Sequence, residues 1–290
     1  SPIVLAAARR AGVPLPPYLF ALCMGANVGS AATLSGNPQN MLIGTLSGDS
    51  YRGFLLRLAP VAIGGLAIVS GLLHLFFART LRAVPAAGID APEPRLHRGL
   101  LRLTLVVLGG VVVAFLAGVR LPFAALAGAC ALLAGTRIAP RHVFLRVDWT
   151  LLLFFASLFV LVEGVVRVGA AEWLHEMFAP YLGETARRQA SVFSVLAVIG
   201  SNLVSNVPFI LVARPWIGGL ENPELQWRVL AMATTFAGNL TILGSVANLI
   251  VLEAAGRETR LGFWDYFRVG APVTIATTLW GLLALLLFHG

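Results

Sequence analysis

Amide and hydroxyl side chains are concentrated within residues 25–44, which read GANVGSAATLSGNPQNMLIG. The segment lies in a run from residue 11 to residue 48 that contains no charged residue. Its glycines and proline weaken a helix, and a break would free backbone N–H groups that attract an anion. The freed carbonyls and the side-chain oxygens can hold a small cation. The pattern predicts a neutral polar binding site within this segment.

A second copy of this pattern occurs at 237–251, AGNLTILGSVANLIV. This copy would build the mirror half of the site. Asn27 aligns with Asn239 at an offset of 212 residues, and Asn40 aligns with Asn248 at an offset of 208. The tripeptide Ala-Pro-Val follows both copies, at 59–61 and 271–273. Internal repeats of this kind are typical of secondary transporters.

A third polar turn, SNLVSNVP, occurs at 201–208. Small residues also allow close helix packing, and Asn or Ser can join helices by hydrogen bonds. That alternative would explain a single polar segment. Two copies in register and a third turn favour the binding site.

The composition indicates a polytopic helical membrane protein. Of 290 residues, 58% are hydrophobic and 12% are charged. Several uncharged runs match the roughly 20 residues that cross a bilayer as a helix. The net charge of +8 comes from arginines in short loops, which fits the positive-inside rule better than nucleic-acid binding. Two cysteines and five scattered histidines form no disulfide framework or metal-ligand spacing, so no cofactor is expected.

The repeat divides the chain into two halves. Residues 1–80 are interpreted as the C-terminal part of the first repeat, with a broken helix at 17–47, a polar loop at 48–57 and a span at 58–79. Residues 81–99 form a loop between the repeats, expected to be cytoplasmic. Residues 100–290 are interpreted as the second repeat, with a re-entrant hairpin at 189–218, a broken helix at 225–255 and a last span at 270–288. In this topology the two copies cross the membrane in opposite directions.

The motifs GANVGSAATLSGNPQN, SNLVSNVP and AGNLTILGSVAN resemble the signature segments of the ion transporter superfamily. That group includes citrate-transporter-like permeases, divalent anion/sodium symporters, arsenite permeases and sodium/proton antiporters. The resemblance covers essentially the whole chain and implies two inverted repeats. It also implies that hairpin tips and helix breaks bind the substrate and, in symporters, sodium. Carried over to this chain, the resemblance implies a site formed by the first break (Asn27, Ser30, Thr33, Asn37 and Asn40), the hairpin tip (Ser201, Asn202, Ser205 and Asn206) and the second break (Asn239, Thr241, Ser245 and Asn248). The corresponding sodium ligands here would be Ser205, Asn206, Gly238 and Asn239.

Two departures from these relatives limit the transfer of function. In the arsenite permeases and sodium/proton antiporters that the motifs resemble, the hairpin tip and the first break each commonly carry an acidic residue. The matching positions in this chain are Ser205 and Asn37. A proton-coupled exchanger needs a titratable group at its site. The divalent symporters carry Ser-Asn-Thr at hairpin tips, whereas Val207 follows Asn206 here. Glu163 is an alternative proton carrier, although Arg167 lies four residues further and could pair with it.

We therefore expect a secondary transporter that moves a small anion by alternating access, with sodium coupling left open. Arsenite efflux or sodium/proton exchange is the alternative within the superfamily, and a channel also stays open. A membrane-embedded enzyme is less consistent, because no catalytic Ser/His, HExxH or paired-Asp set is found. The expected location is the cell inner membrane, with a homodimer as an open alternative for assembly. The chain begins inside an apolar segment, so we also expect the first hairpin to lie upstream of Ser1.

Overall fold

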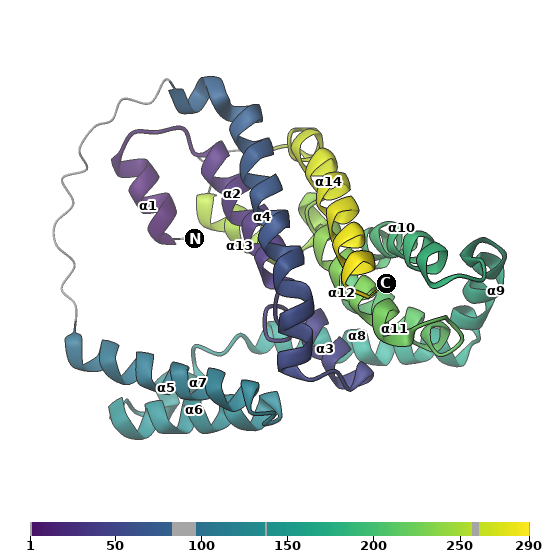
Figure 1. Cartoon of the computed structure of the whole chain (residues 1–290). Coiled ribbons are helices and arrows are strands. Elements are labelled where there is room, and N and C mark those ends of the chain that lie inside the picture. Colours follow the sequence, from purple (N-terminus) through teal and green to yellow (C-terminus); the bar gives the residue numbers. More distant parts are fainter. Residues whose placement is uncertain (1, 83–96, 137, 257–260, 290) are drawn as a thin grey trace.

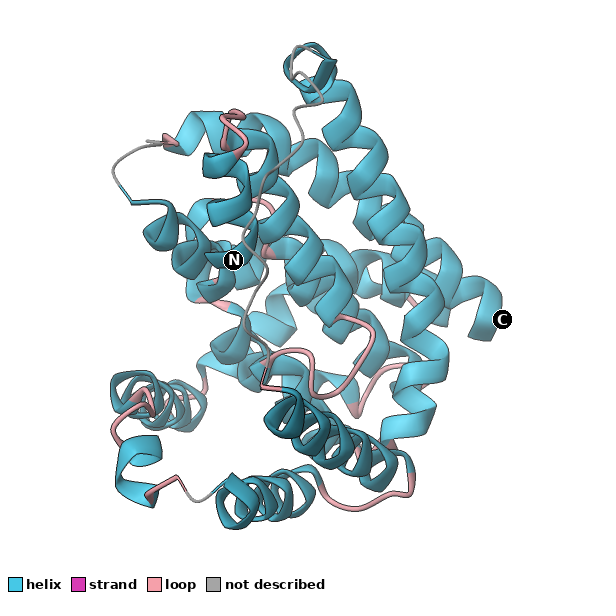
Figure 2. Ribbon diagram, turned by 90° about the vertical axis from the view of Figure 1, so that its left-hand side faces the viewer, coloured by secondary structure: helices cyan, strands magenta, loops and turns pink. Residues whose placement is uncertain are grey.

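The computed structural model describes residues 2–82, 97–136, 138–256 and 261–289. Every regular element in these ranges is a helix, and no strand occurs among them (Figure 2). The expected loop at 81–99 and several loop arginines lie largely outside the described residues. The helices are α1 Pro2–Arg10, α2 Pro16–Ser30, α3 Pro38–Ser47, α4 Tyr51–Arg82, α5 Arg98–Leu116, α6 Leu121–Thr136, α7 Pro140–Phe144, α8 Trp149–Arg167, α9 Ala170–Leu182, α10 Ala186–Val204, α11 Asn206–Ile217, α12 Pro223–Ala237, the 3-10 turn η1 Ile242–Gly244, α13 Val246–Ala255 and α14 Phe263–His289.

Three of the described helices are long and apolar enough to cross a membrane: Tyr51–Arg82, Arg98–Leu116 and residues 263–288 of α14. Helices α8 and α9 make a fourth span if the pair, which bends by 66°, is counted as one. Helix α6 is apolar but shorter. The all-helical, polytopic membrane fold expected from the composition is confirmed.

Two of the spans begin earlier than the sequence predicted. Helix α4 starts at Tyr51, so the polar loop expected at 48–57 is wrong beyond Ser50. The Ser50 hydroxyl accepts from the Gly53 N–H (3.0 Å) and so caps the first turn. Helix α14 likewise starts at Phe263, where Asp265 accepts from the Gly262 N–H (3.0 Å). Hydrogen bonds that cap the first turn therefore allow each helix to begin seven residues before the span expected from the uncharged residues, at 51 instead of 58 and at 263 instead of 270.

Helices α4 and α14 pack side by side in the middle of the molecule, and α2 and α12 pack against them (Figure 1). Glycines permit this close approach. A Cβ at Gly64 would lie 2.2 Å from the Trp280 ring, and one at Gly281 would lie 2.8 Å from Met232. The Trp280 indole N–H donates to the Val61 carbonyl (3.1 Å). Small residues therefore fix the central helix pair, as they do in membrane helix interfaces generally.

Helix α12 forms the core of the fold. Nearly all of its residues are buried, and it contacts α10, α14, α2 and α3. Its Arg228 side chain is only 7% exposed and bonds Asp49, between α3 and α4, at 2.9 and 3.0 Å. Arg228 also lies 3.4 Å from Glu224, whose side chain is 80% exposed. The buried ion pair joins the start of α12 to the first half of the chain.

We predict that Asp49→Ala lowers the free energy of unfolding by about 3 kcal/mol, because Arg228 would lose a buried partner. Glu224→Ala is the matched control and should cost less than about 1 kcal/mol, since the Glu224 carboxylate is exposed to solvent and Arg228 keeps Asp49 as a partner. Thermal unfolding in detergent measures both. Equal shifts in Tm for the two variants would contradict the assignment.

Candidate functional site

The first predicted break lies between α2 and α3, at residues 31–37. Gly36 is required there, because a Cβ would lie 2.0 Å from the Ser30 carbonyl oxygen. Asn37 caps α3, its side chain accepting from the Asn40 N–H at 2.7 Å. The Asn40 amide nitrogen donates to the carbonyls of Ser30 (3.2 Å) and Thr33 (3.1 Å). Asn40 is fully buried and satisfies carbonyl groups that the break releases.

The second break, between α12 and α13, has the same construction. Ser245 caps α13, its hydroxyl accepting from the Ala247 N–H (3.2 Å). The Asn248 amide nitrogen donates to the carbonyls of Gly238 (2.7 Å) and Thr241 (3.1 Å). Asn248 is also fully buried. Both breaks are thus held by an asparagine that reaches back to carbonyls seven and ten residues before it.

Corresponding residues of the two breaks are 208 positions apart in the sequence. This offset pairs Asn40 with Asn248, and the carbonyls that Asn40 binds with those that Asn248 binds. The same offset places Thr235, and not Asn239, opposite Asn27. The expected alignment of Asn27 with Asn239 at 212 residues is therefore wrong within the breaks. The connection between α13 and α14 is four residues longer than that between α3 and α4, which accounts for the offset of 212 between the Ala-Pro-Val tripeptides.

The two breaks contact one another through Asn27. Its amide nitrogen donates to the Oδ1 atoms of Asn239 (2.9 Å) and Asn248 (3.1 Å), and its own Oδ1 accepts from the Ser245 hydroxyl (2.8 Å). In the first half, Ser30 donates to the Asn27 carbonyl (2.7 Å). These groups form one continuous polar network among buried apolar helices.

The third predicted turn joins the network from the side. Helices α10 and α11 fold back on each other and pack closely. Gly200 permits this packing, because a Cβ there would lie 2.2 Å from the Phe209 ring. The tip residue Ser205 has a φ of 75°, a strained value for a residue other than glycine. Asn202 donates to the Ala237 carbonyl (3.0 Å) and accepts from Thr241 (3.1 Å).

Asn206 also turns towards the second break and donates to the Gly244 carbonyl (3.3 Å). Its Oδ1 atom is buried and has no partner among the described residues, and the same holds for the Nδ2 atom of Asn239. A buried polar atom without a partner is costly unless a ligand or water satisfies it. One open acceptor and one open donor are therefore available beside the second break.

Three predicted site residues do not place a side chain in this network. The Ser201 hydroxyl bonds the Ala197 carbonyl of its own helix, and the Ser205 side chain is exposed. Thr33 contributes its backbone carbonyl. Of the sodium ligands expected from the resemblance, the Gly238 carbonyl and the Asn239 Oδ1 already accept N–H groups.

Two buried residues of the network were missed from the sequence, Thr235 and Gln39. The Thr235 hydroxyl receives the side-chain N–H groups of Asn37 and Gln39 and donates to Asn40. The 208-residue offset from Asn27 was the signal that could have identified Thr235. Glu163 lies outside the network and pairs with Arg167 at 2.8 Å, as its spacing indicated.

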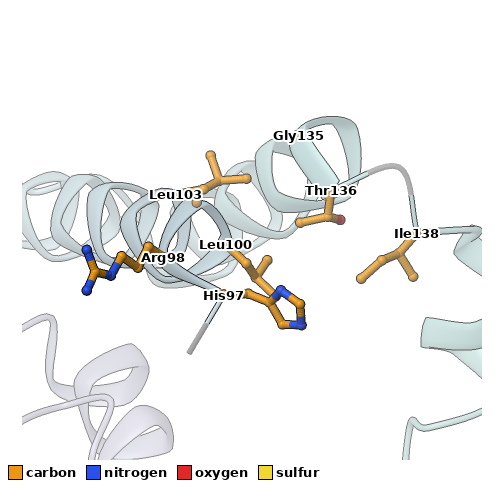
Figure 3. Close-up of a pocket in the computed structure, with 8 residues that line it drawn as sticks. His97, Arg98, Leu100, Leu103, Gly135, Thr136 and Ile138 are labelled. Atoms are coloured by element: carbon orange, nitrogen blue, oxygen red, sulfur yellow. The ribbon is translucent and has the colours of Figure 1, made fainter. Parts of the chain in front are cut away.

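No group of three or more His, Cys, Asp or Glu side chains within the described ranges could hold a metal ion. A cavity of about 680 Å³ lies elsewhere, at the start of α5 and the end of α6 (Figure 3). His97, Leu103 and Thr136 are among its lining residues, and the Arg98 side chain extends away from Thr136. None of its lining residues belongs to the polar network.

Comparison with known proteins identifies the family. A family model described as "Citrate transporter" matches residues 1–237. The chain belongs to the citrate transporter family. An uncharacterized transporter of Mycobacterium tuberculosis (strain ATCC 25618 / H37Rv) is 31% identical over 290 residues, covering 94% of this chain and 68% of the relative. The silicon efflux transporter LSI3 of Oryza sativa subsp. japonica is 30% identical, covering 96% of this chain and 72% of the relative.

A putative transporter arsB of Dictyostelium discoideum is 39% identical over 184 residues, which cover 62% of this chain and 32% of that protein. The citrate transporter family and these relatives confirm the superfamily that the motifs resemble. They identify the chain as a membrane transporter and not an enzyme. The polar network therefore lies in a protein whose family moves solutes across membranes.

We predict that Gly36→Ala destabilises the fold by about 1–3 kcal/mol, because the added Cβ would overlap the Ser30 carbonyl. Gly25→Ala is the matched control, since its Cβ would meet no atom within 4 Å and lies in the middle of α2. That change should be neutral or stabilising. The unfolding midpoint in detergent is the measurement, and a Gly36→Ala protein as stable as Gly25→Ala would show that the break tolerates a side chain.

Proposed function

We propose that this protein is a secondary active transporter that moves a small anion, a carboxylate or an inorganic oxyanion, by alternating access. The polar network at the two helix breaks is the binding site in this proposal. The observation that supports it most is that three polar segments meet at one place. Asn27 beside the first break, and Asn202 and Asn206 at the α10–α11 tip, all donate hydrogen bonds to residues at the second break. The proposed membrane is the cell inner membrane, and the proposed assembly is a homodimer.

The chemistry of the network favours an anion for two reasons. Its described side chains are amides and hydroxyls, so no carboxylate repels a negative ligand. Helices α3, α11 and α13 each begin at the network, and their N-termini carry partial positive charge. The open Nδ2 of Asn239 adds a donor. Sodium is the proposed coupling ion, with the open Oδ1 of Asn206 as an oxygen ligand.

A second candidate is the efflux of an uncharged hydroxylated solute such as arsenous or silicic acid. The names of two relatives, a silicon efflux transporter and a putative arsB transporter, favour it. Neutral amides and hydroxyls can bind such a solute as donors and acceptors. The same assay distinguishes the two candidates.

The test is uptake by the purified protein in liposomes, with labelled citrate, succinate, phosphate, sulfate, arsenite and silicic acid, with and without sodium. We expect saturable anion uptake, and counterflow of labelled anion would separate a carrier from a channel. Asn206→Ala and Asn239→Ala should each abolish binding while the protein stays folded. Ser205→Ala is the control, because its side chain is exposed. Normal anion uptake by both asparagine variants would refute the site assignment. Transport restricted to arsenite or silicic acid would refute the anion as substrate and support the second candidate, an uncharged hydroxylated solute.

A further prediction concerns coupling to protons. Among the described residues, no titratable side chain belongs to the network, and Asn37 and the tip residue Ser205 stand where related exchangers carry acids. We expect no sodium or lithium flux driven by a pH gradient above that of empty vesicles. A strong flux of this kind would contradict the proposal, and its loss in Glu163→Gln would identify the proton carrier.

A further inference from the structure

Thr235 is linked to the opposite half of the chain. Its side chain is 2% exposed, two residues before the end of α12. The hydroxyl accepts from Asn37 Nδ2 (3.3 Å) and Gln39 Nε2 (3.4 Å) and donates to Asn40 Oδ1 (3.4 Å). A hydroxyl donates one hydrogen bond and accepts two, so its capacity is filled. The three partners are the last residue of the first break, Asn37, and two residues in the first turn of α3, Gln39 and Asn40.

Asn27 makes the reciprocal contacts. It lies on α2, three residues before that helix ends, and its three side-chain bonds go to Asn239, Asn248 and Ser245 of the second break. The bond from Asn27 to Asn248 Oδ1 has its counterpart in the bond from Thr235 to Asn40 Oδ1. Each side chain therefore extends from the helix before its own break to the helix that follows the other break.

The two sets of bonds differ in length. Those of Asn27 measure 2.8–3.1 Å, whereas those of Thr235 measure 3.3–3.4 Å. Longer hydrogen bonds are weaker. The contacts that Thr235 makes with the opposite half are therefore weaker than those that Asn27 makes, although the geometry is the same.

We propose that Thr235 and Asn27 are crossed positioning residues, each of which fixes the broken segment of the opposite half. Thr235 positions residues 31–40, and Asn27 positions residues 238–248. Because its contacts are weaker, the hold of Thr235 on the opposite half is the more easily released of the two. The effect on substrate rests on the proposed function, but the crossed positioning does not.

Hydrogen exchange measured by mass spectrometry tests the crossing without a ligand. Thr235→Val keeps the shape of the side chain and removes the hydroxyl, and should speed exchange across residues 31–41 about tenfold, since partners are left unsatisfied. Thr234→Val is the matched control: Thr234 is equally buried, and its hydroxyl bonds Leu230 and Ala231 of its own helix. Asn27→Thr should instead speed exchange across residues 238–248. Thr235→Ser should restore the wild-type rates.

Two results would overturn the crossing. One is equal exchange patterns for Thr235→Val and Thr234→Val, and the other is faster exchange in Thr235→Val confined to residues 238–248. These readings do not need a known substrate.

Uptake in liposomes tests the link to substrate. For an anion that the wild type transports, Thr235→Val should raise KM about tenfold with little change in maximal rate, and Thr234→Val should leave KM unchanged. Wild-type uptake with an unaltered KM in Thr235→Val would refute the positioning role for substrate while the proposed function stands. A wild type that transports no anion of the panel would refute the proposed function, and the exchange measurement would still decide the crossing.

Discussion

Backbone groups released by a broken helix must find hydrogen-bond partners, because a bilayer supplies none. The whole centre of this protein depends on how that requirement is met. Asn40 and Asn248 each donate to two carbonyls at the start of, or within, the break that precedes them. Their amide oxygens then remain free to accept from the other half of the chain, and Asn27 and Thr235 are the donors. One amide therefore satisfies its own break and attaches it to the second break.

The surrounding helices constrain the geometry of this arrangement by close packing. Gly270 of α14 approaches the second break so closely that a Cβ would lie 2.3 Å from the Asn239 carbonyl oxygen. Gly65 of α4 makes a similar approach to Val28 beside the first break, where a Cβ would lie 2.7 Å from that side chain. The buried Arg228–Asp49 pair joins the halves again at the start of α12. Close packing and one ion pair thus hold the two breaks against each other.

The sequence predicted the class of fold and both breaks because hydrophobic runs and clustered Gly, Asn and Pro are local signals. It could not predict which polar side chains point inwards. Ser201 and Asn202 are neighbours of similar type, yet the helix directs them to different partners, one within α10 and one across to α12. Thr235 and Gln39 lie in ordinary helical sequence, and only tertiary packing brings them together. The Arg228–Asp49 pair spans 179 residues and has no local signal at all.

The neutral character of the network has an electrical consequence. Moving one elementary charge through a membrane potential changes the free energy by about 2.3 kcal/mol per 100 mV. The side chains that join the two breaks carry no formal charge, and Arg228 moves together with Asp49 if the pair stays intact. In the proposed cycle, the return of the empty carrier would then move no net charge from the binding site. Any dependence of the transport rate on membrane voltage would therefore report the net charge of the solutes carried, so that current measured for a substrate of known charge would give the number of coupling ions.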